Sequence, residues 1–476
     1  MNVLRTLHEN LIPVTLSLVL VLILLSGCSG AGNTSQPQLG AQGTVDMFVT
    51  DAETDKFNQI MVTITKITLL GSDSASSQVI FQGTQTVDLR KLTDFSAFLA
   101  KSSVSAGNYS KIRLAISKIV LNQVDDNGNL VDTQSVTLPS GHIDLNPRQT
   151  ISLASGDQQT IEIDFDARNS FKMAQTGSGK VVFRPVVFVH LKNGSSSTQP
   201  GRLVRQHGTI TSLDLVGDTF KLCHLSSVST HDQETEQGDD CLNVSFSDQT
   251  LIYDQSLGAM TTDGLVENSE VTVLGYLNGE DSGSHIDARA MVMGPSGTIT
   301  STRGSVVSTP DANGTWTLAV TPGQDVPSGN TTVQLADTAQ IFSRSSGDVL
   351  ASADLVANTP VVVIGQFDSG SSTINAIVVS VADANDEVTG TVSTVDTLAS
   401  GVTLTVDPGD GSGQCVSVDS STHIAVQGTS DDDHVDLIGP TDINVGADIT
   451  AQGTTGSDGC LNADNVVIDG ASGSGS

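Results

Sequence analysis

Residues 59–70 read QIMVTITKITLL, and the spacing of their apolar side chains predicts the fold class. The apolar residues first alternate with polar ones at the period of two that is typical of a half-buried strand. After Thr65 and Lys66 the alternation changes phase, because Ile67 and Leu69 now take the apolar positions. Such a slip predicts a β-bulge, or a strand that passes from one packed surface to another. Both structures belong to a twisted sheet and not to a helical bundle.

The same slip recurs in the run that begins at Tyr109, between Ile116 and Ile119. Two slipped strands and their alternating neighbours predict an all-β fold class. We therefore expect residues 43–192 to form an N-terminal β-sandwich.

One helical pattern interrupts these strands. Leu92, Phe95, Phe98 and Leu99 are spaced three and four residues apart, which would place them on one face of a helix. We expect this short helix to close one end of the sandwich.

From residue 203 onward the sequence consists of three similar copies. Each copy opens with a β-run that carries a glycine, at Gly208, Gly304 or Gly390, and later has an apolar run that ends in a glycine, at Gly275, Gly365 or Gly453. Five or six short strands per copy predict three small β-barrels or open β-sandwiches, at residues 203–294, 301–381 and 387–469.

Seven residues before each of these second glycines stands Asn268, Asn358 or Gly446. Asn and Gly are the residues that most readily tolerate a left-handed backbone. We expect a tight turn with positive φ at this place in every copy.

The N-terminus has the pattern of an export signal. Residues 16–25 are almost wholly apolar, but ten residues cannot span a bilayer as a helix. The residues that follow, Ser26, Gly27 and Cys28, resemble together with Leu25 the bacterial lipobox. This resemblance predicts a lipoprotein signal peptide at 1–27, lipid attachment at Cys28 and a flexible tether at 28–42. Ser29 after the cysteine favours the outer membrane.

The composition fits a surface protein. The formal net charge is −32, from 21 basic and 53 acidic residues, and only 4% of residues are aromatic. A strongly acidic chain repels the phosphate backbone, so we expect no nucleic acid among its partners.

The four later cysteines form two sequence pairs. Cys223 and Cys241 are 18 residues apart, and Cys415 and Cys460 are 45 apart. In an oxidising envelope compartment we expect each pair to form a disulfide. The alternative for the first pair is a zinc site in which the two thiolates join His224 and His231.

A second candidate metal site is an acidic run. Asp431, Asp432, Asp433 and Asp436 would repel one another unless water or a hard cation such as Ca²⁺ lies between them. A solvated loop is the simpler interpretation, so we expect no cofactor, with calcium as the alternative.

Charged residues of the N-terminal domain suggest a third candidate site: Asp164, Asp166, Arg168, Arg113 and Arg184. Alternation puts the two aspartates on the face opposite the apolar residues of their strand. We expect them to face solvent or to pair with arginine, the alternative being a ligand site.

Trp316 alternates with Leu318 in the second repeat, which favours a core position over a platform for sugar stacking. No nucleophile elbow, zinc-protease motif, P-loop or dinucleotide fingerprint occurs in the sequence. We therefore expect no catalytic residues and no enzymatic activity.

The N-terminal domain resembles DUF4382, a family of bacterial envelope lipoproteins of unknown function. The resemblance rests on Thr50-Asp51-Ala52, Val87-Asp88-Leu89, the run from Ala106 to Leu114, Asp164-Phe165-Asp166 and Arg184-Pro185-Val186. Glu53 stands where the family usually has Pro. The resemblance implies a transthyretin-like or carbohydrate-binding-like sandwich, an analogy of fold and not of function.

The repeats are similar to DUF5666, a second family of unknown function that consists of small β-domains in tandem. Neither family implies a reaction.

Together these features predict a non-catalytic, lipid-anchored cell-envelope protein with a binding or adhesion role. Its partners would be the membrane, through the lipid, and a glycan or protein ligand. The alternatives are a purely structural surface spacer and an envelope hydrolase that uses carboxylates.

Overall fold

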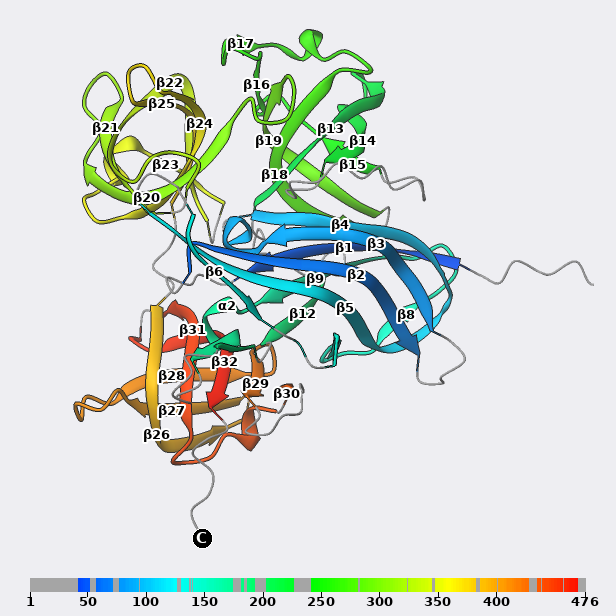
Figure 1. The fold of residues 1–476 in the computed structure, drawn as a ribbon, viewed down its shortest axis with the longest axis vertical. Helices are drawn as coiled ribbons and strands as arrows, with labels where there is room; N and C mark the ends of the chain where they lie inside the picture. Colours follow the sequence, from blue (N-terminus) through cyan, green and yellow to red (C-terminus); the bar gives the residue numbers. More distant parts are fainter. Residues whose placement is uncertain are drawn as a thin grey trace, which may run out of the picture. The chain divides into compact units, whose positions relative to one another are not determined.

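The computed structural model describes residues 42–469 apart from 52–56, 72–76, 94, 126–129, 137, 139, 174–180, 184–185, 193–202, 227–240, 281–282, 323, 345–346, 382–385, 400, 428–434, 438 and 457. The regular secondary structure of the described chain is almost entirely β-strand, which confirms the predicted fold class (Figure 1). No helix in these ranges is long and apolar enough to cross a membrane.

The N-terminal part of the chain forms two facing sheets. The first sheet has the order β12 (Val187–Lys192), β9 (Gln158–Phe165), β1 (Gln42–Asp51) and β4 (Phe95–Ser105). The second has the order β3 (Gln78–Asp88), β2 (Gln59–Gly71), β5 (Gly107–Val124) and β6 (Leu130–Val136), and β7 (His142–Leu145) and β8 (Ile151–Leu153) pair along β5. β1 pairs in parallel with β9 and antiparallel with β4, so the first sheet is mixed.

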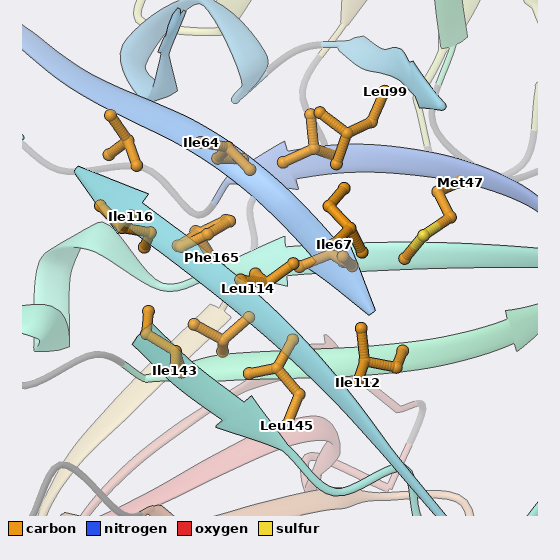
Figure 2. Packing of buried hydrophobic residues seen from close by; sticks show 14 of the residues in the cluster. Met47, Ile64, Ile67, Leu99, Ile112, Leu114, Ile116, Ile143, Leu145 and Phe165 are labelled. Atoms are coloured by element: carbon orange, nitrogen blue, oxygen red, sulfur yellow. The ribbon is translucent and has the colours of Figure 1, made fainter. Parts of the chain in front are cut away.

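The core lies between these two sheets. Figure 2 shows Met47 and Phe165 of the first sheet packing with Ile67 and Leu114 of the second. All four side chains are at most 1% exposed. The alternation of apolar residues along both sheets therefore produces the expected β-sandwich.

Both predicted phase changes are bulges. The register of β2 shifts between Ile64 and Lys66 against β3 and β5, and that of β5 shifts between Ile116 and Lys118 against β2. The extra residue in each strand restores the inward direction of the later apolar side chains.

The predicted helix is wrong. Residues 89–92 form a single 3₁₀ turn, η2 (Leu89–Leu92), and Phe95, Phe98 and Leu99 belong to strand β4. Residues 95–100 are buried on both faces of β4, and its register shifts beside Phe98. A strand that is apolar on both faces and carries a bulge can reproduce helical spacing by coincidence.

Each repeat forms a five-stranded barrel. Barrel one closes in the order β13 (Leu203–Asp214), β14 (Thr219–Ser226), β15 (Leu242–Ser245), β19 (Gly283–Met293), β18 (Glu270–Glu280) and back to β13. Barrel two closes through β20 (Thr300–Ser308), β21 (Thr315–Val320), β22 (Gly329–Ser343), β25 (Thr373–Val381) and β24 (Pro360–Asp368). Barrel three closes through β26 (Asp386–Leu398), β27 (Gly401–Asp407), β28 (Gln414–Asp419), β32 (Leu461–Asp469) and β31 (Asp448–Thr455).

The remaining described elements are short. They are α2 (Ala167–Ser170), β10 (Phe171–Met173), β11 (Val181–Phe183), β16 (Leu251–Tyr253), β17 (Ala259–Met260), η3 (Thr262–Gly264), β23 (Val349–Leu350), η4 (Ser352–Asp354), β29 (His423–Gln427), β30 (Val435–Leu437) and η5 (Pro440–Asp442).

The three barrels share one topology. In each, the third strand pairs in parallel with the fifth, and the other pairings around the barrel are antiparallel. A closed barrel with strand order one, two, three, five, four and this single parallel pair is the OB-fold. Of the two predicted alternatives for the repeats, the structure has the barrel.

The recurring Asn or Gly performs the predicted role in every barrel. The φ angles of Asn268, Asn358 and Gly446 are 64°, 70° and 89°. In each turn this residue's N–H donates to a backbone oxygen of the first barrel strand, which joins the turn to that strand. The three barrels thus use the same left-handed turn just before the fourth barrel strand.

Candidate functional site

The outer surface of barrel one carries a regular grid of polar side chains. Alternation along β14, β15 and β19 buries Phe220, Val244 and Ile286 and turns their neighbours outward. The strand register places these outward residues in two rows. The Lys221 row consists of Lys221, Asn243 and His285, and the Thr219 row consists of Thr219, Ser245 and Asp287.

A shallow groove of about 370 Å³ lies over this grid. It is lined by Ser212, Thr219, Phe220, Lys221, Asn243, Val244, Ser245 and His285. An ammonium, an amide, an imidazole and several hydroxyls therefore converge on one concavity, which gives a ligand both donors and acceptors.

Asp287 links the two rows. The Ser245 hydroxyl donates to Asp287 Oδ1 at 2.5 Å, and Nε2 of His285 lies 3.1 Å from the same oxygen. In a hydrolytic triad the serine proton goes to the imidazole, whereas here it goes to the carboxylate. The arrangement orients polar groups for hydrogen bonding and does not have the order of an activated nucleophile.

A disulfide borders the grid. Cys223 and Cys241 are bonded, and they continue the ladder of β14 and β15 beyond Leu222 and Leu242. The Thr211 hydroxyl lies 3.0 Å from Cys223 Sγ. The predicted disulfide is confirmed, and the zinc alternative is wrong because both sulfurs are consumed in the bond. Of the two histidines proposed as ligands, His231 and the His224 side chain lie outside the described residues.

The second predicted disulfide, Cys415–Cys460, is also present. It joins β28 to the residue just before β32 in barrel three.

The glycines that end the second apolar run of each repeat, here called the closing glycines, allow the three barrels to be compared residue by residue. Gly275, Gly365 and Gly453 pair with Ala288, Ala376 and Ala463 across the fourth and fifth strands. Three residues before these alanines stand His285, Thr373 and Cys460, which are therefore equivalent.

The second and third strands of each barrel supply the other two residues of the equivalent rows. In barrel two the row that corresponds to Lys221, Asn243 and His285 is Thr317, Thr332 and Thr373. In barrel three it is Thr405 with the bonded pair Cys415 and Cys460. Of the three equivalent rows, the row in barrel one is the one that combines a cation, an amide and an imidazole.

The charged residues predicted as a site in the N-terminal domain are not brought together as one. Arg113 forms a bidentate ion pair with Asp144, with N–O distances of 2.6 and 2.7 Å. The hydrogen bond from Arg113 holds the pKa of Asp144 below its ordinary value, and the guanidinium charge adds to this effect. Arg113 thus pairs with an aspartate that the sequence analysis did not consider, and not with Asp164 or Asp166.

Asp164 lies in β9 and Asp166 directly follows this strand. Neither faces solvent, so the expectation that they would be exposed is wrong. Asp164 is 5% exposed and Asp166 is 3% exposed, because both faces of β9 are covered. Asp164 lies 3.7 Å from His190 Nε2, and Asp166 accepts hydrogen bonds from the backbone and side-chain nitrogens of Asn169. Arg184 and the Arg168 side chain lie outside the described residues.

The other candidates give simpler outcomes. Trp316 is 2% exposed and lies in the core of barrel two, as predicted. Cys28 and Asp431, Asp432 and Asp433 lie outside the described residues, as does the side chain of Asp436 in β30. Among the side chains that the structure does describe, no three His, Cys, Asp or Glu residues come together as metal ligands.

Sequence reasoning missed the grid of barrel one. Alternation alone shows which residues face outward, but only the strand register shows which of them are neighbours. The clustered Lys, Asn, Ser and His at alternating positions of three runs were the signal available in the sequence.

Residues 42–185 match the model of a family described as Domain of unknown function (DUF4382). The N-terminal sandwich is a DUF4382 domain. The match ends before the barrels, so the resemblance of the repeats to DUF5666 stays a prediction. No curated protein matches the chain in sequence.

Among solved structures, a deletion mutant of the single-stranded DNA-binding protein from Thermus aquaticus matches with 16% identity. The match covers 38% of this chain and 91% of that chain, and its TM-score is 0.12. A TM-score this low supports no conclusion about fold or function.

Proposed function

We propose that this chain is a non-catalytic glycan-binding protein of the bacterial envelope, held at the outer membrane by lipid on Cys28. The groove over the Lys221 row is the observation that carries the proposal. Its hydroxyl, amide and imidazole groups match the alternating donors and acceptors of a sugar.

The size of the groove favours a glycan over a protein ligand. A groove of about 370 Å³ is in the range of small-molecule sites and accommodates a sugar unit or two. A stable protein partner instead needs about 800 Å² of interface on each side. The OB-fold is known to bind oligosaccharides through this surface, which supports the proposal by analogy of fold alone.

Barrels two and three fit the spacer role better. Where barrel one has Asn243 and His285, barrel two has two threonines and barrel three has a disulfide. We assign ligand binding to barrel one and a supporting or spacing role to the other two.

A glycan array tests the proposal, with the soluble chain that begins at Ser29, followed by calorimetry with the best glycan. The variant Asn243→Ala should weaken binding about fivefold, since one hydrogen bond contributes about 1 kcal/mol. Thr332→Ala, the equivalent change in barrel two, is the matched control and should leave affinity unchanged. Absence of any glycan binding, or equal affinity of Asn243→Ala and the unmodified chain, would contradict the proposal.

A further inference from the structure

Lys221 gives the groove a charge that its other lining residues do not supply. Its side chain is exposed, on the outward face of β14. Within the part of the chain that the structure describes, no carboxylate lies within ion-pair distance of its ammonium. Two other basic groups, in contrast, are paired: Lys101 with Asp46 at 3.5 Å and Arg113 with Asp144.

The nearest acid on the grid does not neutralise this ammonium. Asp287 lies on β19, two strands from Lys221, and adjacent strands are about 4.8 Å apart. It also accepts the hydrogen bond of Ser245 and faces His285. Asp287 therefore contacts groups of its own strand and of β15, and Lys221 remains available to a ligand.

Lys221 also distinguishes barrel one from its two copies. The equivalent residues are Thr317 and Thr405, which are neutral. A cation at this place is thus not required for the barrel to fold, because two barrels of the same topology form without it.

We propose that the groove of barrel one binds an acidic sugar, whose carboxylate or phosphate pairs with Lys221 while its hydroxyls bond to Asn243, Thr219 and Ser245. This inference rests on the proposed function and names the substrate class of the same groove. The net charge of −32 opposes a long polyanion such as a nucleic acid, whose charges extend over much of the protein surface. A sugar unit or two contacts Lys221 locally, and at physiological ionic strength charges more than about 8 Å away are largely screened.

Calorimetry with the soluble chain from Ser29 tests this proposal with two matched pairs of probes. Trigalacturonic acid is compared with its neutral methyl ester, and glucose 6-phosphate with glucose. At least one acid should bind tenfold or more tightly than its neutral partner, and the pair that shows the preference identifies the carboxylate or the phosphate as the recognised group.

Substitutions test whether Lys221 causes the preference for the acidic probe. Lys221→Gln should abolish the preference for the acidic probe, and Lys221→Arg should keep it. Lys118→Gln, which removes the same charge from an exposed position on β5, should behave as the unmodified chain.

The outcomes separate this inference from the proposed function. If neutral glycans bind, Asn243→Ala weakens them and no acidic preference exists, the acidic-sugar inference is overturned and the glycan-binding function stands. A preference that survives Lys221→Gln also overturns it. If neither acids nor neutral glycans bind, both proposals are wrong.

Discussion

At the scale of single residues, His207 of β13 is one group whose pKa in the folded state links the stability of barrel one to pH. Burial lowers the pKa of its imidazole, Arg205 adds to this effect, and Glu270, 3.9 Å away, opposes it. Its Nδ1 lies 3.1 Å from the Thr272 hydroxyl. Because the folded state resists protonation, the unfolded state takes up the proton first as the pH falls.

We therefore predict that the stability of barrel one decreases as the pH falls below about 6.5, the ordinary pKa of histidine, down to the lower pKa of the folded state. The variant His207→Gln should lose part of this decrease. Urea unfolding at pH 7.5 and 5.5 measures the difference. Parallel pH dependence of the variant and the unmodified chain would show that His207 does not contribute.

At the scale of strands, the closing glycines set the shape of the barrels. The register between the fourth and fifth strands shifts at Gly275, Gly365 and Gly453, so each marks a bulge. A Cβ at Gly365 would lie 2.0 Å from the backbone oxygen of Asn375. Backbone cannot move aside as a flexible side chain can, so only glycine fits this crossing.

The variant Gly365→Ala should destabilise barrel two by about 2 kcal/mol or more, as overpacking usually does. Gly107→Ala is the control, since a Cβ there meets nothing within 4 Å. It should be neutral or stabilise by up to about 1 kcal/mol, because alanine restricts the unfolded chain. Chemical denaturation of both variants measures this, and equal stability of the two would refute the steric explanation.

The strands also show how far sequence can predict this fold. The slips after Thr65 and Ile116 and the turns at Asn268 and Asn358 were predictable, because each depends on local geometry. The segment at Phe95 was not, since burial of both faces hides the period of two. The grid of Lys221, Asn243 and His285 depends on pairing between strands far apart in sequence, which no local pattern contains.

At the scale of the whole molecule, the predicted anchor would determine where the domains act. Several acyl chains on one cysteine would hold a protein at a membrane durably, since each buried methylene contributes about 0.8 kcal/mol. The sequence around Cys28 predicts this attachment, and the acidic composition of the domains gives no other attraction to an anionic membrane.

The variant Cys28→Ala should appear in the soluble fraction after cell disruption, whereas the unmodified chain should sediment with outer membranes. Fractionation with immunoblotting measures this. Retention of the two disulfides, checked by thiol labelling, controls for folding. If the variant still fractionates with membranes, lipid attachment at Cys28 is wrong.

One pair of neighbouring positions carries Asn243 and His285 in barrel one, Thr332 and Thr373 in barrel two, and the Cys415–Cys460 bond in barrel three. The same scaffold accepts a polar contact pair, two small hydroxyls or a covalent cross-link at this place. None of these residue pairs is therefore required for the barrel topology. Substituting the two residues at these positions could therefore change ligand specificity. The other two barrels of the same chain would serve as internal controls for folding.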